Sequence, residues 1–248
     1  YKISSKQSLL FNMVGKILQT NYDYSYTENV NENNSHFEYG VEGKRKSLIT
    51  EIMHTYSLKN LSWDSGLRYK YSDTHNLYSY DIINDFDSKD QNLYAYTQFS
   101  GNVKNIYYMG GIGINWVSFK EGGNSFYKVL YRPLGRIKYM PLDNFSMSYQ
   151  FSMQPTIPSL STLSGITKSL NRYEFETGNS ALHPYDNIKH KLSLSWNPNR
   201  WYISLNYNIE SAKNLFAPGI YCQNGKLGYQ HINFDSKTVS KIDFYTSF

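Results

Sequence analysis

An acidic segment is the first stretch of this sequence whose residue types could do chemistry. "DIINDFDSKD" at 81–90 brings Asp85, Asp87 and Asp90 close together along the chain. Carboxylate oxygens are the ligands that a hard cation such as Ca²⁺ prefers. The segment lacks the glycine and the closing glutamate of an EF-hand loop. A solvated acidic loop is therefore the favoured interpretation, and a Ca²⁺ site is the alternative.

The other reactive residue types form no catalytic pattern. There is no HExxH or close histidine pair and no G-x-S-x-G elbow. "GGIGIN" at 110–115 lacks the Lys-Ser/Thr of a phosphate loop, so close packing along a strand explains it better. Cys222 is the only cysteine, which excludes an intrachain disulfide and a cysteine-based metal site. His190 falls on the apolar phase of its strand and is expected to be structural. The sequence predicts neither an enzyme nor a cofactor.

A tyrosine- and asparagine-rich stretch is the candidate recognition surface. "NYDYSYTENVNENNSHFEYG" at 21–40 is predicted to be a loop, and it carries Tyr22, Tyr24 and Tyr26. Tyrosine offers a rigid stacking face and a hydroxyl, which suit sugars or peptides. These three residues are the candidate ligand-binding residues, and low-complexity loop filler is an equal alternative.

The composition fits a sheet whose two faces meet different surroundings. Aromatic residues make up 17% of the 248 residues and charged residues only 18%, while the net charge is +5. The densest basic run, Lys44-Arg45-Lys46, is too short to indicate nucleic-acid binding. No stretch approaches the ~18 apolar residues of a transmembrane helix.

The elements that must position these residues are β-strands. In "KLSLSWNPNRWYISLNYNIE" at 191–210, apolar and polar residues alternate on both sides of a turn, as in a β-hairpin. The same alternation recurs along the chain, and Pro133 is expected to mark an edge strand or a bulge. We expect about ten strands, near 7–18, 45–58, 61–73, 90–101, 105–119, 126–140, 144–153, 185–197, 199–213 and 235–248.

The links between these strands are predicted to alternate in length. Short turns are expected at 59–60, 101–105, 141–144 and 197–199, and long loops at 19–44, 74–89, 154–184 and 214–234; only the link near 120–126 breaks the rule. Short turns at one end and long loops at the other are typical of an up-and-down outer-membrane β-barrel.

Aromatic residues flank the short turns, as in the interfacial girdle of such a barrel. Trp196 and Trp201 stand on either side of the turn at 197–199. The apolar face then points outward to lipid and the polar face lines the lumen. In the hairpin this predicts lipid-facing Leu192, Leu194, Ile203 and Leu205, and lumen-lining Lys191, Ser193, Asn206 and Asn208.

The stretch from 145 to 196 resembles the barrel of TonB-dependent outer-membrane receptors, most closely the SusC-like proteins of Bacteroidetes. The resemblance rests on a "P-S-x-x-x-L" loop followed by "G-N-x-x-L-x-P" and a returning strand. The matching positions are Pro158, Ser159, Leu163, Gly178, Asn179, Leu182, Pro184 and Tyr185.

The resemblance implies a transport protein of the bacterial outer membrane. Residues 1–248 would be part of a barrel of about 22 antiparallel strands, without the plug domain and TonB box of a complete receptor. The implied partners are outer-membrane lipid, the TonB system acting through the plug, and a surface lipoprotein. The cargo would be a large nutrient: a glycan, peptide, siderophore or cobalamin. A soluble secreted binding or adhesion module and a porin without a plug are the alternatives.

Overall fold

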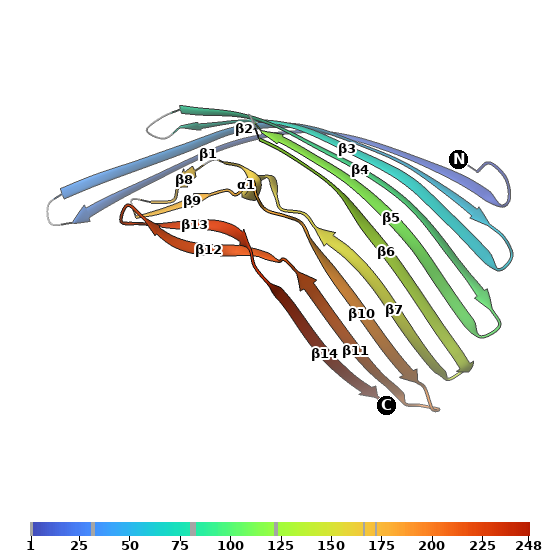
Figure 1. The fold of residues 1–248 in the computed structure, drawn as a ribbon. Coiled ribbons are helices and arrows are strands. Elements are labelled where there is room, and N and C mark those ends of the chain that lie inside the picture. Colours follow the sequence, from blue (N-terminus) through green and yellow to red (C-terminus); the bar gives the residue numbers. More distant parts are fainter. Residues whose placement is uncertain (1, 31–32, 80–82, 122–123, 166, 172) are drawn as a thin grey trace.

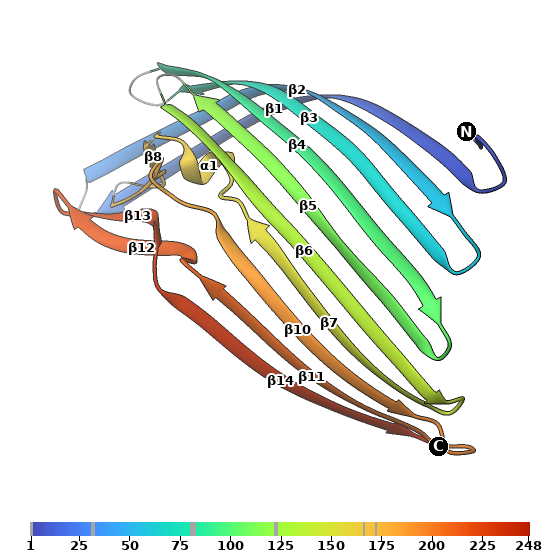
Figure 2. The same ribbon diagram turned by 45° about the vertical axis from the view of Figure 1, so that its right-hand side comes forward.

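A long, curved antiparallel sheet dominates the structure, a computed structural model that describes residues 2–30, 33–79, 83–121, 124–165, 167–171 and 173–248 (Figure 1). Its ten strands follow one another in an up-and-down order, and β1 and β14 form its two edges (Figure 2). The strands are β1 (Gln7–Val30), β2 (Asn33–Ser57), β3 (Leu61–Ser79), β4 (Ile83–Val103), β5 (Ile106–Glu121), β6 (Asn124–Leu142), β7 (Phe145–Thr156), β10 (Tyr185–Trp196), β11 (Tyr202–Lys213) and β14 (Ser236–Ser247). Among the described residues, no helix is long and apolar enough to cross a membrane.

The ten predicted strands are confirmed, but two of the predicted long loops are wrong. The segments 19–44 and 74–89 belong mostly to strands, because β1 pairs with β2 up to Val30 and Asn33, and β3 pairs with β4 up to Ser79 and Ile83. Alternating tyrosines such as Tyr22 and Tyr24 favour extended backbone, and each strand finds its neighbour in sequence beside it. These hairpins are therefore extensions of the sheet. Residues 31–32 and 80–82 lie outside the described part.

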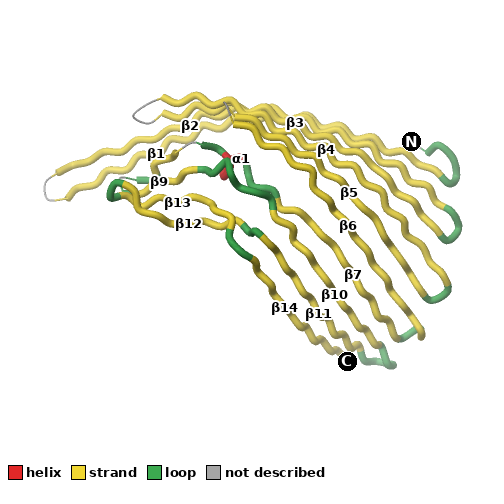
Figure 3. Tube along the Cα trace, viewed as in Figure 1, coloured by secondary structure: helices red, strands yellow, loops and turns green. Residues whose placement is uncertain are grey.

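The other two long links, 154–184 and 214–234, fold into a second sheet, which we call the small sheet. It consists of β8 (Thr167–Ser169), β9 (Glu174–Thr177), β12 (Phe216–Gln223) and β13 (Lys226–Asn233), with a helical turn α1 (Leu160–Leu163) ahead of it. The two links are joined by parallel pairing of β13 with β9. Figure 3 shows the small sheet and α1 on the concave side of the main sheet, at the end opposite to both chain termini.

The convex face of the main sheet is apolar and exposed. Tyr149, Leu192, Tyr207 and Ile242 pair directly across β7, β10, β11 and β14. They are exposed by 44%, 43%, 37% and 69%. A patch of this kind is rare on a monomer in water, and it suits a strand surface that faces lipid.

The adjacent row on the concave face is polar. Arg136, Gln150, Lys191, Asn208 and Lys241 pair directly across β6, β7, β10, β11 and β14. Because side chains alternate between the faces of a sheet, this row lies one residue along from the apolar row and on the opposite side. The concave side therefore has the character of a wet or filled lumen.

Aromatic side chains contact one another beside the short turns. Trp63 stacks on Phe99 with ring centroids 5.7 Å apart, and Trp201 lies 4.9 Å from Phe248. Their exposure next to the turns has the form of an interfacial girdle.

Pro133 lies in a central strand, so the prediction of an edge position is wrong. It pairs with Ile112 in the β5–β6 ladder, while the β6–β7 ladder begins only at Leu134. A proline cannot donate a backbone hydrogen bond. It is tolerated because it sits where one of the two ladders of β6 ends. The irregularity in β6 is instead a register shift between Tyr139 and Leu142.

The two faces can be distinguished by placing one charge on each. We expect Leu192→Lys to lower the free energy of unfolding in a bilayer by about 2–4 kcal/mol, because it places an ammonium group in hydrocarbon. Ser195→Lys, on the concave face of the same strand, is the matched control and should cost much less. Denaturant titration of the full-length protein in lipid vesicles measures both. Equal costs would contradict the assignment of the faces.

Candidate functional site

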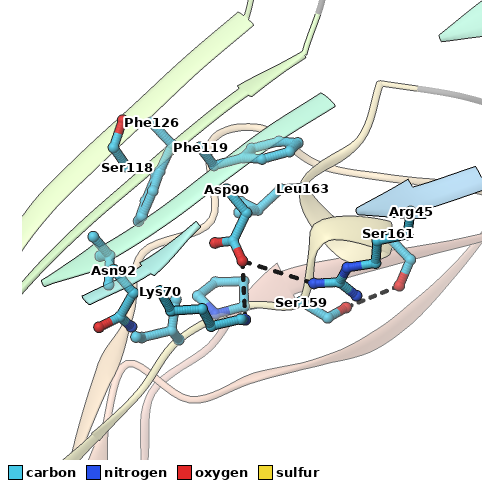
Figure 4. Close-up of a pocket in the computed structure, with 13 residues that line it drawn as sticks. Arg45, Lys70, Asp90, Asn92, Ser118, Phe119, Phe126, Ser159, Ser161 and Leu163 are labelled. Carbon is cyan, nitrogen blue, oxygen red and sulfur yellow. Dashed lines mark hydrogen bonds and ion pairs between the residues drawn. The ribbon is translucent and has the colours of Figure 1, made fainter. Parts of the chain in front are cut away.

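A cavity of about 450 Å³ lies between the concave wall and the loop that carries α1 (Figure 4). The wall contributes charged and amide side chains from β2, β3 and β4, and the loop contributes hydroxyl groups. The polar residues lining it are Arg45, Lys70, Asp90, Asn92, Ser118, Ser159 and Ser161. The arrangement suits a hydrophilic ligand.

Asp90 is the electrostatic centre of this cavity. Its Oδ2 lies 3.0 Å from Lys70 Nζ and 3.8 Å from Arg45 Nη2, and the same guanidinium donates a 3.2 Å hydrogen bond to the buried Ser72 hydroxyl. Three strands are thereby linked through one carboxylate. Asp90 lies with these cations and apart from Asp85 and Asp87, so the predicted grouping of three aspartates is wrong.

Ser159 forms the start of the helical turn above the cavity. Its Oγ accepts a 3.2 Å hydrogen bond from the Thr162 backbone N–H, and its carbonyl accepts bonds from the Thr162 hydroxyl and the Leu163 N–H. This is the pattern of a helix N-cap. The serine of the "P-S-x-x-x-L" loop therefore shapes the loop, while Ser161 and Pro158 line the cavity beside it.

The two leucines of the sequence pattern anchor the loops to the wall. Leu163 is 2% exposed and Leu182 is fully buried, and both pack with Phe119 of β5. Phe126 and Phe216 pack against this cluster, which we call the loop core. Burial of such side chains is worth about 1.5–3 kcal/mol each. The loop core holds the roof of the cavity on the concave wall.

Gly178 and Asn179 join the two links to each other. Asn179 Nδ2 donates to the His231 carbonyl at 2.9 Å, and its Oδ1 accepts from the Ala181 N–H at 3.0 Å. A Cβ on Gly178 would overlap the carbonyl of Ser164. This position therefore needs glycine for close approach of two backbones.

Asn233 completes this connection from the other link. It donates to the His183 carbonyl at 3.0 Å and to the Asn214 carbonyl at 2.7 Å, and its Oδ1 accepts from the His183 N–H at 2.9 Å. The resemblance pattern thus consists largely of residues that build the roof, and Asn233 is a member of the same network that sequence reasoning missed.

Asp85 and Asp87 converge on His75, a residue that sequence reasoning did not group with them. His75 Nδ1 lies 2.9 Å from Asp87 Oδ1 and 3.2 Å from Asp85 Oδ1. Candidate ligand atoms of the three lie within 4.8 Å of one another, and all three residues are exposed. The register of β3 and β4 pairs His75 with Asp87, which a loop prediction for 74–89 concealed. The hydrogen bond that the imidazolium donates to Asp87 and the negative charge of Asp85 raise the pKa of His75 above its ordinary value.

Tyr22, Tyr24 and Tyr26 lie on β1 rather than in a loop, and they do not line the cavity. Their side chains are exposed by 52%, 36% and 40%. Spaced two residues apart on one strand, they share a face. His190, predicted to be structural, shares a 2.8 Å hydrogen bond with the Tyr149 hydroxyl.

Removing the buried end of Leu182 should loosen the roof without disturbing the main sheet. We expect Leu182→Ala to lower the free energy of local opening by about 2–5 kcal/mol, because it leaves a cavity in the loop core. Leu170→Ala, in the same link but 41% exposed, is the control. Hydrogen exchange should increase in 157–184 and 214–234 only for Leu182→Ala. Equal exchange in both variants would rule out the anchoring role.

His75 should titrate above its ordinary pKa, and Asp87→Asn should lower that pKa more than Asp85→Asn, since Asp87 supplies the hydrogen bond and part of the charge. The attraction is complete below the ordinary histidine pKa and disappears as pH rises through the raised one. NMR titration of the imidazole measures both effects. A larger shift in Asp85→Asn would contradict this geometry.

Comparison with solved structures identifies the fold. No known family profile matches the sequence, and no curated protein matches it. The copper transporter OprC superposes with a TM-score of 0.72 at 10% identity, over 98% of this chain and 41% of its own. FpvA of P. aeruginosa, bound to pyoverdines, gives 0.72 at 12% identity over 100% and 36%. The ferric-catecholate import receptor Fiu of E. coli K12 gives 0.67 at 10% identity over 98% and 43%. The chain spans less than half the length of each and has the fold of part of such a receptor barrel.

Proposed function

We propose that residues 1–248 form part of the barrel of a TonB-dependent receptor that imports a large nutrient across the bacterial outer membrane. The observation that carries this is the opposite character of the two faces of one continuous sheet. The convex row through Leu192 is apolar and exposed, and the concave row through Lys191 is polar. Lipid outside and a hydrophilic lumen inside account for both.

The finer assignment rests on the loop pattern that runs from Pro158 to Tyr185. It supports a SusC-like receptor of Bacteroidetes with about 22 strands, a plug and a TonB box elsewhere in the protein, and a surface lipoprotein as partner. The barrel itself would do no chemistry on its cargo, and no cofactor is needed for this role.

The cavity beneath α1 is the proposed first contact of the cargo with the wall. Arg45, Lys70 and Asn92 offer donors, and Ser161 offers a hydroxyl group. Tyr22, Tyr24 and Tyr26 are proposed as stacking contacts nearer the outside. The candidate cargoes are a siderophore, a cobalamin, a glycan or a peptide. The similar solved structures include a copper transporter and receptors for iron complexes, and this favours a cargo that carries a metal.

The two alternatives fit the geometry less well. A soluble secreted module would expose the convex row, including Ile242 at 69%, to water. A porin without a plug needs an open lumen, whereas the loop core holds α1 and the small sheet over the concave side. Neither alternative accounts for both faces of the sheet and its roof.

Fractionation and uptake together test this function. The full-length protein should be extracted from outer membranes only with detergent, and the unheated protein should migrate differently on a gel from the heated one. Uptake is then measured for a panel of iron complexes, cobalamin, glycans and peptides. For one of these compounds, uptake should be lost in a strain that lacks this protein and also in a strain that lacks TonB. A monomer in detergent-free buffer would contradict the barrel, and uptake that is independent of TonB would favour the porin.

A further inference from the structure

A second cavity, of about 170 Å³, lies on the concave wall next to the first. Lys70 and Asn92 line both cavities. The second cavity lies nearer the short turns than the first cavity does. Strand β5 begins at a short turn, and its residue Asn115, which lines the second cavity, comes before Val117 and Phe119, which line the first. A ligand that moves along the concave wall from the first cavity toward the short turns reaches the second cavity.

The lining of this second cavity is cationic. Arg68, Lys70 and Arg132 contribute to it, and among the described residues no carboxylate does. Lys70 is paired with Asp90, whereas no ion pair joins Arg68 or Arg132 to any part of the chain that the structure describes. Glu51 is the cross-strand neighbour of Arg68, but no ion pair forms between them. Two guanidinium groups thus face the cavity without a partner charge.

Arg132 is held in place by an aromatic ring. Its guanidinium carbon lies 5.1 Å from the centroid of the Tyr94 ring, within the range of a cation–π interaction. The Tyr94 ring lies over Gly113 of the adjacent strand β5. A Cβ at position 113 would clash with this ring, so the glycine makes room for it. The Nε of Arg132 is buried and has no hydrogen-bond partner among the described residues. The group is positioned, yet one of its donors is unused.

Asn115 is the second observation that points to a ligand. It is 1% exposed, lines the cavity, and its Oδ1 has no hydrogen-bond partner among the described residues. A buried polar atom left unpaired costs about 1–3 kcal/mol. Native structures rarely leave such an atom unsatisfied without a bound group to meet it.

The positive wall continues beyond this cavity. A further cavity of about 220 Å³ on the concave wall is lined by Arg136, Lys138 and Lys191, and again by no carboxylate of the described part of the chain. The Nε of Arg136 is likewise buried without a partner in the described part of the chain. Clustered charge of one sign in a concave wall focuses the field and raises the local concentration of the opposite charge.

We propose that the second cavity binds one oxyanion, a carboxylate, phosphate or sulfate group, of the transported molecule. Arg68 and Arg132 donate charge-assisted hydrogen bonds to its oxygens, and Asn115 Oδ1 accepts from a hydroxyl or amide group beside it. The inference deepens the proposed transport function by giving the cargo a chemical class: an anion that carries a neighbouring hydrogen-bond donor.

Anion titration of the full-length receptor tests this site. Purified protein in detergent is titrated with inorganic phosphate, sulfate or acetate against chloride at constant ionic strength, and heat is measured by calorimetry. Wild type should bind at least one of the three saturably. Arg132→Gln and the isosteric Asn115→Asp should each weaken binding by about tenfold or more, because the first removes a charge-assisted hydrogen bond and the second places a negative charge beside the bound anion.

Lys128→Gln is the matched control, because Lys128 lies on the same face of β6 and does not line the cavity. It should leave the affinity unchanged, and all variants should keep heat-modifiable mobility. Equal weakening by Lys128→Gln would indicate an adventitious ion only, and it would overturn the proposal. Absence of saturable binding in wild type would also overturn the proposal; this is the result expected if a carboxylate of the receptor itself fills the site. Failure of outer-membrane fractionation would instead overturn the transport function, whatever the titration gives.

Discussion

The whole architecture depends on an unbroken backbone ladder from β1 to β14. In the membrane position that we propose for this sheet, no water is present to pair with a free N–H or C=O, so each strand finds its hydrogen-bond partners in its neighbours. This constraint explains why each strand of the main sheet is paired with its neighbours, with one register shift in the β6–β7 ladder, and why Pro133 is tolerated where that ladder has not begun. It also sets the side-chain pattern, because a continuous ladder forces residues to alternate between the convex and the concave face of the sheet.

The buried core lies at one end of the sheet instead of in its middle. A sheet with lipid on one side and a hydrophilic lumen on the other needs no central apolar core. The few fully buried apolar side chains therefore collect where two long links fold back onto the wall, around Phe119, Leu163 and Leu182. Anchoring α1 and the small sheet there creates the first cavity, so packing at the roof and the shape of the cavity depend on the same cluster.

Much of the sheet was predictable from the sequence, because period-two alternation indicates strands with one apolar and one polar face. The ten strands, and the separation of the Leu192 face from the Lys191 face, follow from this alternation. The outward direction of the apolar face was predicted from the alternating loop lengths and from the aromatic residues beside the short turns. The strand extensions were only partly predictable: the alternating tyrosines from Tyr22 favour extended backbone, whereas the acidic stretch around Asp85 carries no clear alternation of apolar and polar residues. The pairing of Asp90 with Lys70, and of Asp87 with His75, depends on register between strands, which composition does not encode. The small sheet joins segments that lie about 50 residues apart in the chain, and no local sequence pattern predicts such a contact.

The meander order of the main sheet has a consequence for how the chain is assembled. Each of the ten strands pairs with the one before it in the chain, apart from the two excursions that build the small sheet. Every new strand can thus be added to an edge that the preceding strand has just created, and most loop-closure entropy is paid in short steps. The small sheet is different, because β9 must wait for β13, which follows two further strands of the wall. Growth of the wall through β11 therefore precedes closure of the roof, and only β14 is added to the wall after the last strand of the small sheet.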